Sequence, residues 1–213
     1  MSMQISERQR VGSLRGIVGQ GRGPSGGGAA PGHEPVPMGT GLLGVAALLA
    51  AVAMLFLAFT SAYLARRQEA GWLEFSPPWM LWVNTGVLLA SSGTLDWARR
   101  RIRLGDAAGL RRGIEATAAL GLLFVLGQVA AWRQLAADGL LLTTNPHSSF
   151  FYVLTAVHGA HLLGGIGALG VVLLRVWQGR YTAQEHAGVT NCATYWHSMD
   201  VLWLYLFVLL FWV

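Results

Sequence analysis

Charged residues are scarce in this chain. They make up 12% of its 213 residues, whereas 54% of the residues are hydrophobic. In soluble globular domains about a quarter of the residues are usually charged, so an ordinary soluble domain is excluded. Lysine is absent, and all 15 basic residues are arginine. The composition predicts an integral membrane protein.

Cysteine is nearly absent as well. Cys192 is the single one, so the sequence can form no disulfide within the chain and offers no cysteine cluster for a metal. The phosphate-binding loop G-x-x-x-x-G-K and the zinc helix H-E-x-x-H are also missing. We therefore expect the isolated chain to have no catalytic centre of its own. Any enzymatic activity would belong to a complex that the chain joins.

Long apolar runs fill the chain after residue 40. Each approaches or exceeds the roughly 20 residues that cross a bilayer core as a helix. The connections between them are no longer than about 15 residues, too short to hide a soluble catalytic domain. We predict an all-α fold, an integral membrane bundle of five transmembrane helices. The runs cover residues 41–65, 78–98, 114–134, 149–176 and 190–213.

Residues 1–40 are rich in glycine, proline, serine and arginine and lack the apolar core of a cleaved signal. We expect them to form a disordered cytoplasmic tail. With the N-terminus inside, twelve arginines fall on the cytoplasmic side and three outside. This distribution predicts a cytoplasmic N-terminus and an external C-terminus. Because the positive charge adjoins the membrane spans, it indicates orientation and contact with anionic lipid, with no nucleic-acid partner.

Ionisable side chains stand inside the last two apolar runs: His158 and His161 in one, His197 and Asp200 in the other. An acid at a helix centre costs roughly 2.5 to 3.5 kcal/mol on insertion scales, so Asp200 requires a partner. A rise of about 1.5 Å per residue places His161 and Asp200 at overlapping depths. They could lie side by side if these sequential helices pack together.

Three interpretations of these residues differ in chemistry. A metal or haem site would use His158, His161 and His197, but the first two share one helix face and cannot clamp haem from opposite sides. The repeated Glu-x-x-His pattern of di-iron bundles is absent. The histidines and Asp200 are better explained as hydrogen-bonded contacts between helices. A role in handling protons or lipid headgroups is the third possibility.

Other polar residues fall where helices would pack. Asn84, Ser91 and Ser92 lie seven and eight residues apart, on one face of the second predicted helix, and Gln128 lies in the third. We expect this face to point toward protein. Asp96 stands close to an arginine cluster, which indicates an interfacial acid paired with arginine.

Four segments in order resemble subunit III of the haem-copper terminal oxidases, a family that includes cytochrome c oxidase and quinol oxidase. Pro77 and Pro78 precede LWVNTGVLLASSGTL, and LGLLFVLGQVAAW resembles the family's next helix. HSSFFYVLTAVHGAHLLGG resembles its Ser-Phe-Phe and His-Gly-x-His element, and YWHSMDVLWLYLF its closing segment. The resemblance covers residues 41–213, which would form an oxidase subunit III-like domain of the five-helix bacterial form.

The resemblance implies a subunit without haem or copper, both of which belong to partner subunits. Oxidase subunits I and II and membrane lipids are the expected partners, in the inner (plasma) membrane of a bacterial cell. The chain would stabilise the catalytic subunit, bind phospholipid and support proton uptake, while the complex reduces oxygen to water. Relatives often carry glutamate where this chain has Val52 and Ala131, so roles of those carboxylates are not expected here.

Two other functions fit parts of the pattern. An accessory subunit of a nitric oxide reductase would share the same domain. A transporter of protons or small solutes would use the histidines and Asp200 within the spans.

Overall fold

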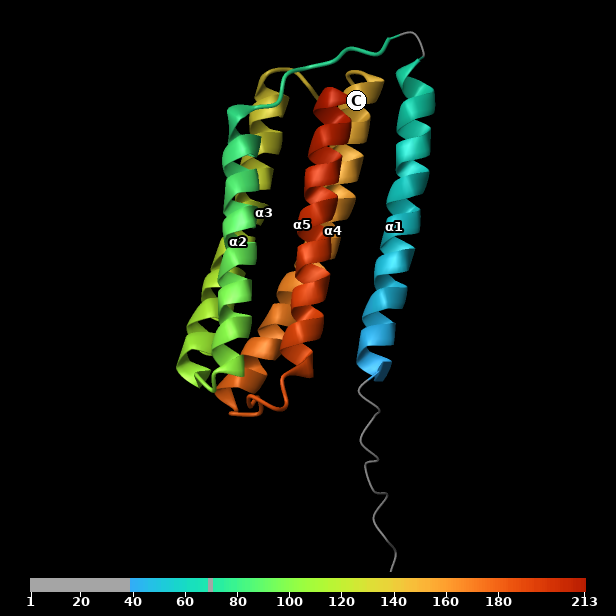
Figure 1. The fold of residues 1–213 in the computed structure, drawn as a ribbon. Coiled ribbons are helices and arrows are strands. Elements are labelled where there is room, and N and C mark those ends of the chain that lie inside the picture. The colour runs from blue at the N-terminus through green and yellow to red at the C-terminus, as the bar shows by residue number, and fades with distance from the viewer. Residues whose placement is uncertain (1–38, 69–70) are drawn as a thin grey trace, which may run out of the picture. The chain divides into compact units, whose positions relative to one another are not determined.

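α-Helices dominate the computed structural model, which describes residues 39–68 and 71–213 (Figure 1). The predicted tail of residues 1–40 lies outside the described residues, apart from the two residues that begin the first helix. The described ranges contain α1 (Gly39–Arg67), α2 (Trp79–Arg103), α3 (Ala107–Ala137), α4 (Pro146–Trp177) and α5 (Ala187–Trp212).

The prediction of an all-α membrane bundle is confirmed. Within the described ranges, α1, α3, α4 and α5 are long and apolar enough to cross a membrane. The second helix, α2, has 25 residues and is less apolar, because polar side chains such as Asn84, Ser91 and Ser92 interrupt its hydrophobic sequence. It nevertheless lies lengthwise beside the other helices (Figure 1).

The helices extend beyond the predicted apolar runs, most clearly at the start of α3. This helix begins at Ala107 rather than near residue 114. Gly105 adopts a φ of 76°, a conformation that favours glycine and reverses the chain directly after α2. The carboxylate of Asp106 then accepts a hydrogen bond from the Gly109 amide at 2.7 Å and caps α3. A polar turn therefore continues into helix instead of forming a long loop.

Two reciprocal hydrogen bonds cap the start of α4. The Asn145 side chain accepts from the Ser148 amide at 3.0 Å, and the Ser148 hydroxyl accepts from the Asn145 amide at 3.3 Å. Pro146 occupies the first helical turn, where its missing N–H costs nothing. This reciprocal cap fixes where α4 enters the bundle.

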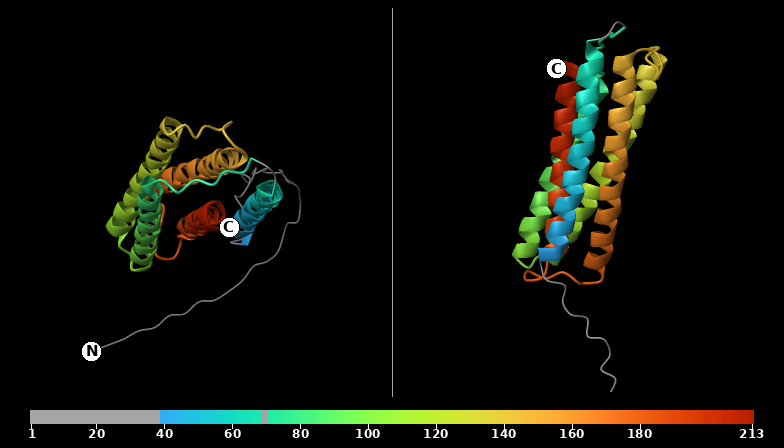
Figure 2. Two further views of the ribbon diagram at one scale, coloured as in Figure 1. Left: turned by 90° about the horizontal axis from the view of Figure 1, so that it is seen from above. Right: turned by 90° about the vertical axis from the view of Figure 1, so that its right-hand side faces the viewer.

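Four of the helices form a closed ring. In it α2 contacts α3, α3 contacts α4, α4 contacts α5, and α5 returns to α2. The first helix, α1, lies outside this ring and packs on α4 and α5, as the view from above shows (Figure 2). Along its most apolar stretch only 11% of α1 is buried, against 44% for α5. The ring is therefore the core of the described fold, and α1 is its least embedded helix.

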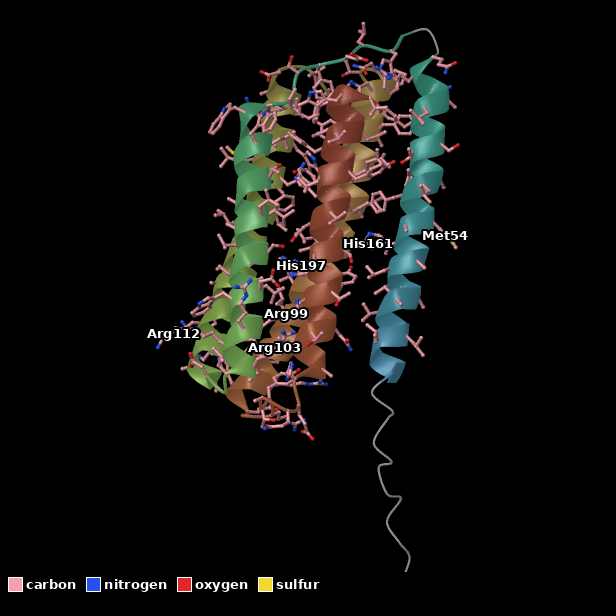
Figure 3. The ribbon with its side chains drawn as sticks, in the orientation of Figure 1. Met54, Arg99, Arg103, Arg112, His161 and His197 are labelled. Carbon is pink, nitrogen blue, oxygen red and sulfur yellow. The ribbon has the colours of Figure 1, made fainter. Side chains whose placement is uncertain are left out.

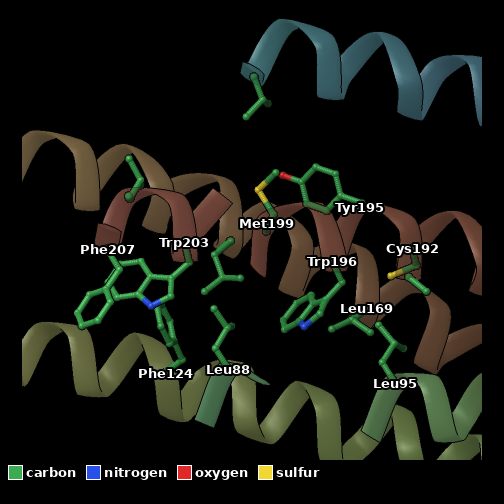
Figure 4. Packing of buried hydrophobic residues seen from close by; sticks show 14 of the residues in the cluster. Leu88, Leu95, Phe124, Leu169, Cys192, Tyr195, Trp196, Met199, Trp203 and Phe207 are labelled. Carbon is green, nitrogen blue, oxygen red and sulfur yellow. The ribbon is translucent and has the colours of Figure 1, made fainter. Parts of the chain in front are cut away.

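Trp196 of α5 fills the middle of the ring (Figure 4). Its indole is fully buried. Glycines on two facing helices make room for it: a Cβ added to Gly121 of α3 would lie 2.6 Å from the indole, and one added to Gly165 of α4 would lie 3.4 Å from it. The large side chain and the two small ones are complementary, as close packing in membrane bundles requires.

The tightest backbone approach in the ring is between α2 and α3. A Cβ added to Gly113 would lie 2.5 Å from the Ala98 Cβ and 3.0 Å from the Ala98 Cα. We expect Gly113→Ala to lower the free energy of unfolding by about 1 to 3 kcal/mol, because overpacking forces the helices apart. Thermal unfolding in detergent, followed by circular dichroism, measures this. Gly93→Ala is the control, since a Cβ there meets nothing within 4 Å; equal loss in both variants would contradict the packing account.

Candidate functional site

A chain of polar side chains joins α2 to α5 and runs from the surface of the bundle to a buried acid. Ser92 of α2 lies 2.8 Å from Nδ1 of His197, and its hydroxyl also donates to the carboxylate of Asp200. Nε2 of His197 lies 3.2 Å from Oδ1 of Asp96. Arg99 in turn donates to the same Asp96 oxygen at 3.2 Å. We call Ser92, Asp96, His197 and Asp200 the α2–α5 polar chain.

The spacing along α5 explains why these residues meet α2. Trp196, Asp200 and Trp203 are four and three residues apart, which places them on one helix face. The two indoles bracket the acid and bond to α2: Trp196 donates to the Ser91 hydroxyl at 3.0 Å, and Trp203 donates to that of Thr85 at 2.9 Å. One face of α5 is therefore bonded to α2 at three successive levels.

Asn84 and Gln128 join α2 to α3, about two helical turns before Ser92 along α2. The Asn84 amide donates to the Phe124 carbonyl at 3.0 Å and approaches the Gln128 Oε1 at 3.5 Å. Gly127 permits this approach, because a Cβ there would overlap the Asn84 side chain. Asn84, Ser91 and Gln128 are all buried. The face of α2 expected to point toward protein does so.

His158 and His161, two of the three histidines of α4, point in different directions. His158 is fully buried, and its ring lies 5.3 Å from that of Trp203 and 6.2 Å from that of Phe124. Neither of its nitrogens has a hydrogen-bond partner among the residues that the structure describes. His161 lies on the α1 side of α4, with its ring 5.9 Å from that of Phe56 (Figure 3). Three residues of separation rotate the side chains enough to give them separate surroundings.

The structure does not pair His161 with Asp200. Nδ1 of His161 contacts the Val157 carbonyl at 2.8 Å within its own helix, and Asp200 is bound by Ser92. Depth alone does not tell which way a side chain points around the helix axis. The histidine near Asp200 is His197, one turn earlier on α5, with Nδ1 3.9 Å from the Asp200 carboxylate.

Asp96 has more than the arginine partner that the sequence predicts. It bonds to Arg99 and also faces His197 across the helix interface, and its side chain is 48% exposed. The acid therefore connects the outside of the bundle to the interior polar chain. Its position close to an arginine cluster indicated the first contact, but only the packing of α2 on α5 produces the second.

Several buried polar contacts involve residues that the sequence did not mark as candidates. His147 is 1% exposed, with Nε2 2.9 Å from the Leu210 carbonyl and Nδ1 3.3 Å from the Leu73 carbonyl. Trp132 of α3 donates to the Thr155 hydroxyl of α4 at 3.1 Å. A buried tryptophan needs a partner for its indole N–H, so the tryptophans themselves were the available signal.

In the part of the chain that the structure describes, no three or more His, Cys, Asp or Glu side chains lie close enough together to hold a metal ion. Val52 and Ala131 are both buried. Val52 lines a groove beside α1, and Ala131 lies on α3. Apolar side chains thus occupy both positions.

A ring of membrane-length helices, joined by hydrogen bonds between buried side chains, defines a multi-pass α-helical membrane protein. The family model for cytochrome c oxidase subunit III matches residues 33–213. The chain therefore belongs to the cytochrome c oxidase subunit III family. The resemblance read from the four sequence segments, to subunit III of a haem-copper oxidase, is confirmed.

Individual relatives agree with the family match. Cytochrome c oxidase subunit 3 of Synechocystis sp. is 36% identical over 190 residues, which cover 86% of this chain and 80% of the relative. The protein of the same name from Thermostichus vulcanus is 35% identical over 178 residues, 80% of this chain and 86% of the relative. A probable cytochrome c oxidase subunit 3 of Mycobacterium bovis is 31% identical over 176 residues, 80% and 87% of the two chains.

Removal of the buried acid tests the importance of the α2–α5 polar chain. We expect Asp200→Leu to leave membrane insertion intact, because leucine is apolar. The free energy of unfolding should fall by about 1 to 3 kcal/mol, since Ser92 and His197 lose a buried partner. Thermal unfolding and the subunit content of the purified complex measure the loss. Val201→Leu, at a position that is 66% exposed, is the control; unchanged stability and subunit content in Asp200→Leu would reject the role.

Proposed function

We propose that this chain is the non-redox subunit III of a haem-copper oxygen reductase, in which it stabilises the catalytic subunit. The observation that carries the proposal is that the buried polar side chains of α2 are hydrogen-bonded to facing helices of the same chain. Ser91, Thr85 and Asn84 of α2 bond to Trp196, Trp203 and the Phe124 carbonyl of facing helices. Side chains engaged in this way hold helices together, so electron transfer and oxygen chemistry fall to partner subunits.

Oxidase subunits I and II are the proposed partners, and the inner (plasma) membrane of a bacterial cell is the proposed location. The positive-inside rule supports a cytoplasmic N-terminus and an external C-terminus. In this orientation the arginine-rich turn between α2 and α3 faces the cytoplasm. We call this end of the bundle, with residues 99–112, the arginine-rich end.

The relatives named above favour an oxygen reductase over a nitric oxide reductase, since each is described as a cytochrome c oxidase subunit. A transporter is less well supported, because the polar chain joins two helices and its exposed end, Asp96, lies at one side of the bundle. Both remain outcomes of the experiment below.

Phospholipid is a second proposed partner, and two grooves beside α1 support it. Each has a volume of about 460 Å³. One runs between α1 and α5 and is lined mainly by apolar side chains, including Leu49, Phe56 and Leu202. The other, which we call the α4 groove, combines apolar side chains of α1 and α4 with Arg175 and Tyr181 at its arginine-rich end. Acyl chains fit the apolar walls, and a guanidinium is suited to a phosphate headgroup.

Purification from native membranes tests the proposed complex. An affinity tag on this chain should capture a haem-bearing subunit, visible in the optical spectrum of the eluate, and oxygen consumption should accompany it. The isolated chain should show neither haem nor activity. Nitric oxide consumption without oxygen consumption would favour the nitric oxide reductase. Solute or proton transport by the pure chain in liposomes, or stoichiometric haem in it, would contradict the proposal.

Arg175 tests the proposed lipid site. We expect Arg175→Gln to lose about one phospholipid per complex after delipidating purification, because the headgroup loses its charged partner. Phosphorus analysis and native mass spectrometry count the lipid that remains. Arg180→Gln is the matched control, because Arg180 lies outside the residues that line the α4 groove. Equal lipid content in the two variants would show that Arg175 holds no headgroup.

A further inference from the structure

The α2–α5 polar chain is a continuous series of hydrogen-bonding groups. Asp96 Oδ1 lies 3.2 Å from Nε2 of His197, and Nδ1 of the same ring lies 2.8 Å from the Ser92 hydroxyl. That hydroxyl reaches Oδ2 of Asp200. The direct distance from His197 to Asp200 is 3.9 Å, beyond hydrogen-bond range. Ser92 is therefore the bridge between the imidazole and the buried acid.

These four groups admit two proton arrangements with the same heavy-atom positions. In the first, His197 carries two protons: Nε2–H donates to the Asp96 carboxylate, Nδ1–H donates to Ser92, and Ser92 donates to the Asp200 carboxylate. In the second, Asp200 carries a proton and donates to Ser92, Ser92 donates to Nδ1, and only Nε2–H remains on the ring. One proton leaves Nδ1 for the Ser92 oxygen while the Ser92 proton moves to Oδ2 of Asp200. No group is lost or gained, and the total charge is unchanged.

The two ends of the series differ in their surroundings. Asp96 is 48% exposed near the arginine-rich end, whereas Asp200 is 4% exposed. From the first residue of α5, His197 lies about 15 Å and Asp200 about 20 Å along the helix axis. The second oxygen of Asp200, Oδ1, is buried and has no hydrogen-bond partner in the described residues. Asp200 is therefore the buried end of the series, with one oxygen bonded to Ser92 and the other unpaired.

We propose that Asp96, His197, Ser92 and Asp200 form a closed-ended proton store. A proton that binds Asp96 passes to an unprotonated Nε2 of His197, which restores the Asp96 carboxylate and gives the first arrangement. The Nδ1 proton then moves through Ser92 to Asp200, which holds it in the middle of the bundle. The store would serve the proton uptake that the subunit III family implies, and in that purpose it rests on the proposed function. Its existence depends only on side chains of this chain. Co-purification tests the complex, and proton exchange at Asp200 tests the store, so the two can fail separately.

Other ionisable groups near α5 do not interrupt the series from Asp96 to Asp200. From α2, Asp96 faces His197, and Arg99 donates to the same Asp96 oxygen. From α4, the His158 ring lies 5.3 Å from that of Trp203, and the carbonyl of His161 accepts from the Tyr195 hydroxyl. From α1, the groove lining toward Met199 and Leu202 is apolar.

Infrared spectroscopy of the full-length chain, with the subunits that purify with it, tests the proposal. A protonated carboxylic acid absorbs apart from carboxylates and shifts in heavy water. We expect one such band to be lost in Asp200→Asn and kept in Glu185→Gln, a variant of an exposed loop acid. After transfer to heavy water, Ser92→Ala should slow the shift of the Asp200 band by about tenfold or more, while Ser92→Thr should restore the wild-type rate.

Ser91→Ala is the matched control for the bridge. It removes the neighbouring hydroxyl, which binds Trp196 and lies outside the proton path. The exchange rate should stay close to the wild-type value, even if stability falls. Near-ultraviolet circular dichroism of the tryptophans checks that each variant is folded. A folded Ser92→Ala chain with an unchanged exchange rate overturns the proposed bridge.

Two further outcomes overturn the store. One is an acid band that survives Asp200→Asn, since Asp200 would then not hold the proton. The other is a proton flux through the chain in liposomes that Ser92→Ala abolishes, since the path would then continue beyond Asp200 and the closed end would be wrong.

Discussion

The hydrogen bonds that α5 makes to α2 are the interactions on which the rest of this bundle depends. In a bilayer, helices gain little from the hydrophobic effect against one another, because lipid is as apolar as their side chains. Association must come from close packing and from polar groups with no other partner. Trp196, Asp200 and Trp203 supply both on one face of α5, since the indoles fill the ring and their N–H groups bond to Ser91 and Thr85. Asp200 adds the hydrogen bond whose loss would cost the most free energy, because it would leave a buried acid without a partner.

Small residues make this arrangement possible. Gly121 and Gly165 leave the space that the Trp196 indole occupies, and Gly113 lets α2 and α3 approach at Ala98. The large and small side chains come from different helices, so the ring closes only when all four are in place. α1 is joined to α5 by the 2.7 Å contact between the Thr60 and Tyr205 hydroxyls, and it borders two grooves. The described fold therefore combines a closed four-helix ring with a less embedded helix at its margin.

Two buried apolar positions within the helices limit where acids can act in this chain. Val52 and Ala131 are buried and carry no charge, so an acid-based role cannot rest on them. The buried acid that remains is Asp200, bonded to Ser92 and linked through His197 to an exposed Asp96. Among the described residues, the α2–α5 contact thus holds this buried acid, whereas His147 and His158 are buried at other contacts.

The sequence by itself determined the five helical segments of the described residues, the apolar middle of each, and the family that the chain resembles, but it missed the polar ends of α2 and α3. Composition and apolar run length decide these features, because a bilayer requires each spanning segment to satisfy its own backbone. The sequence also identified His158, His161, His197, Asp200, Asn84, Ser91, Ser92 and Gln128 as polar residues in need of partners. Only the tertiary structure decided the partners themselves. Depth along a helix follows from counting residues, but direction around it depends on which helices are neighbours, and that placed Asp200 beside Ser92 and His197 rather than beside His161.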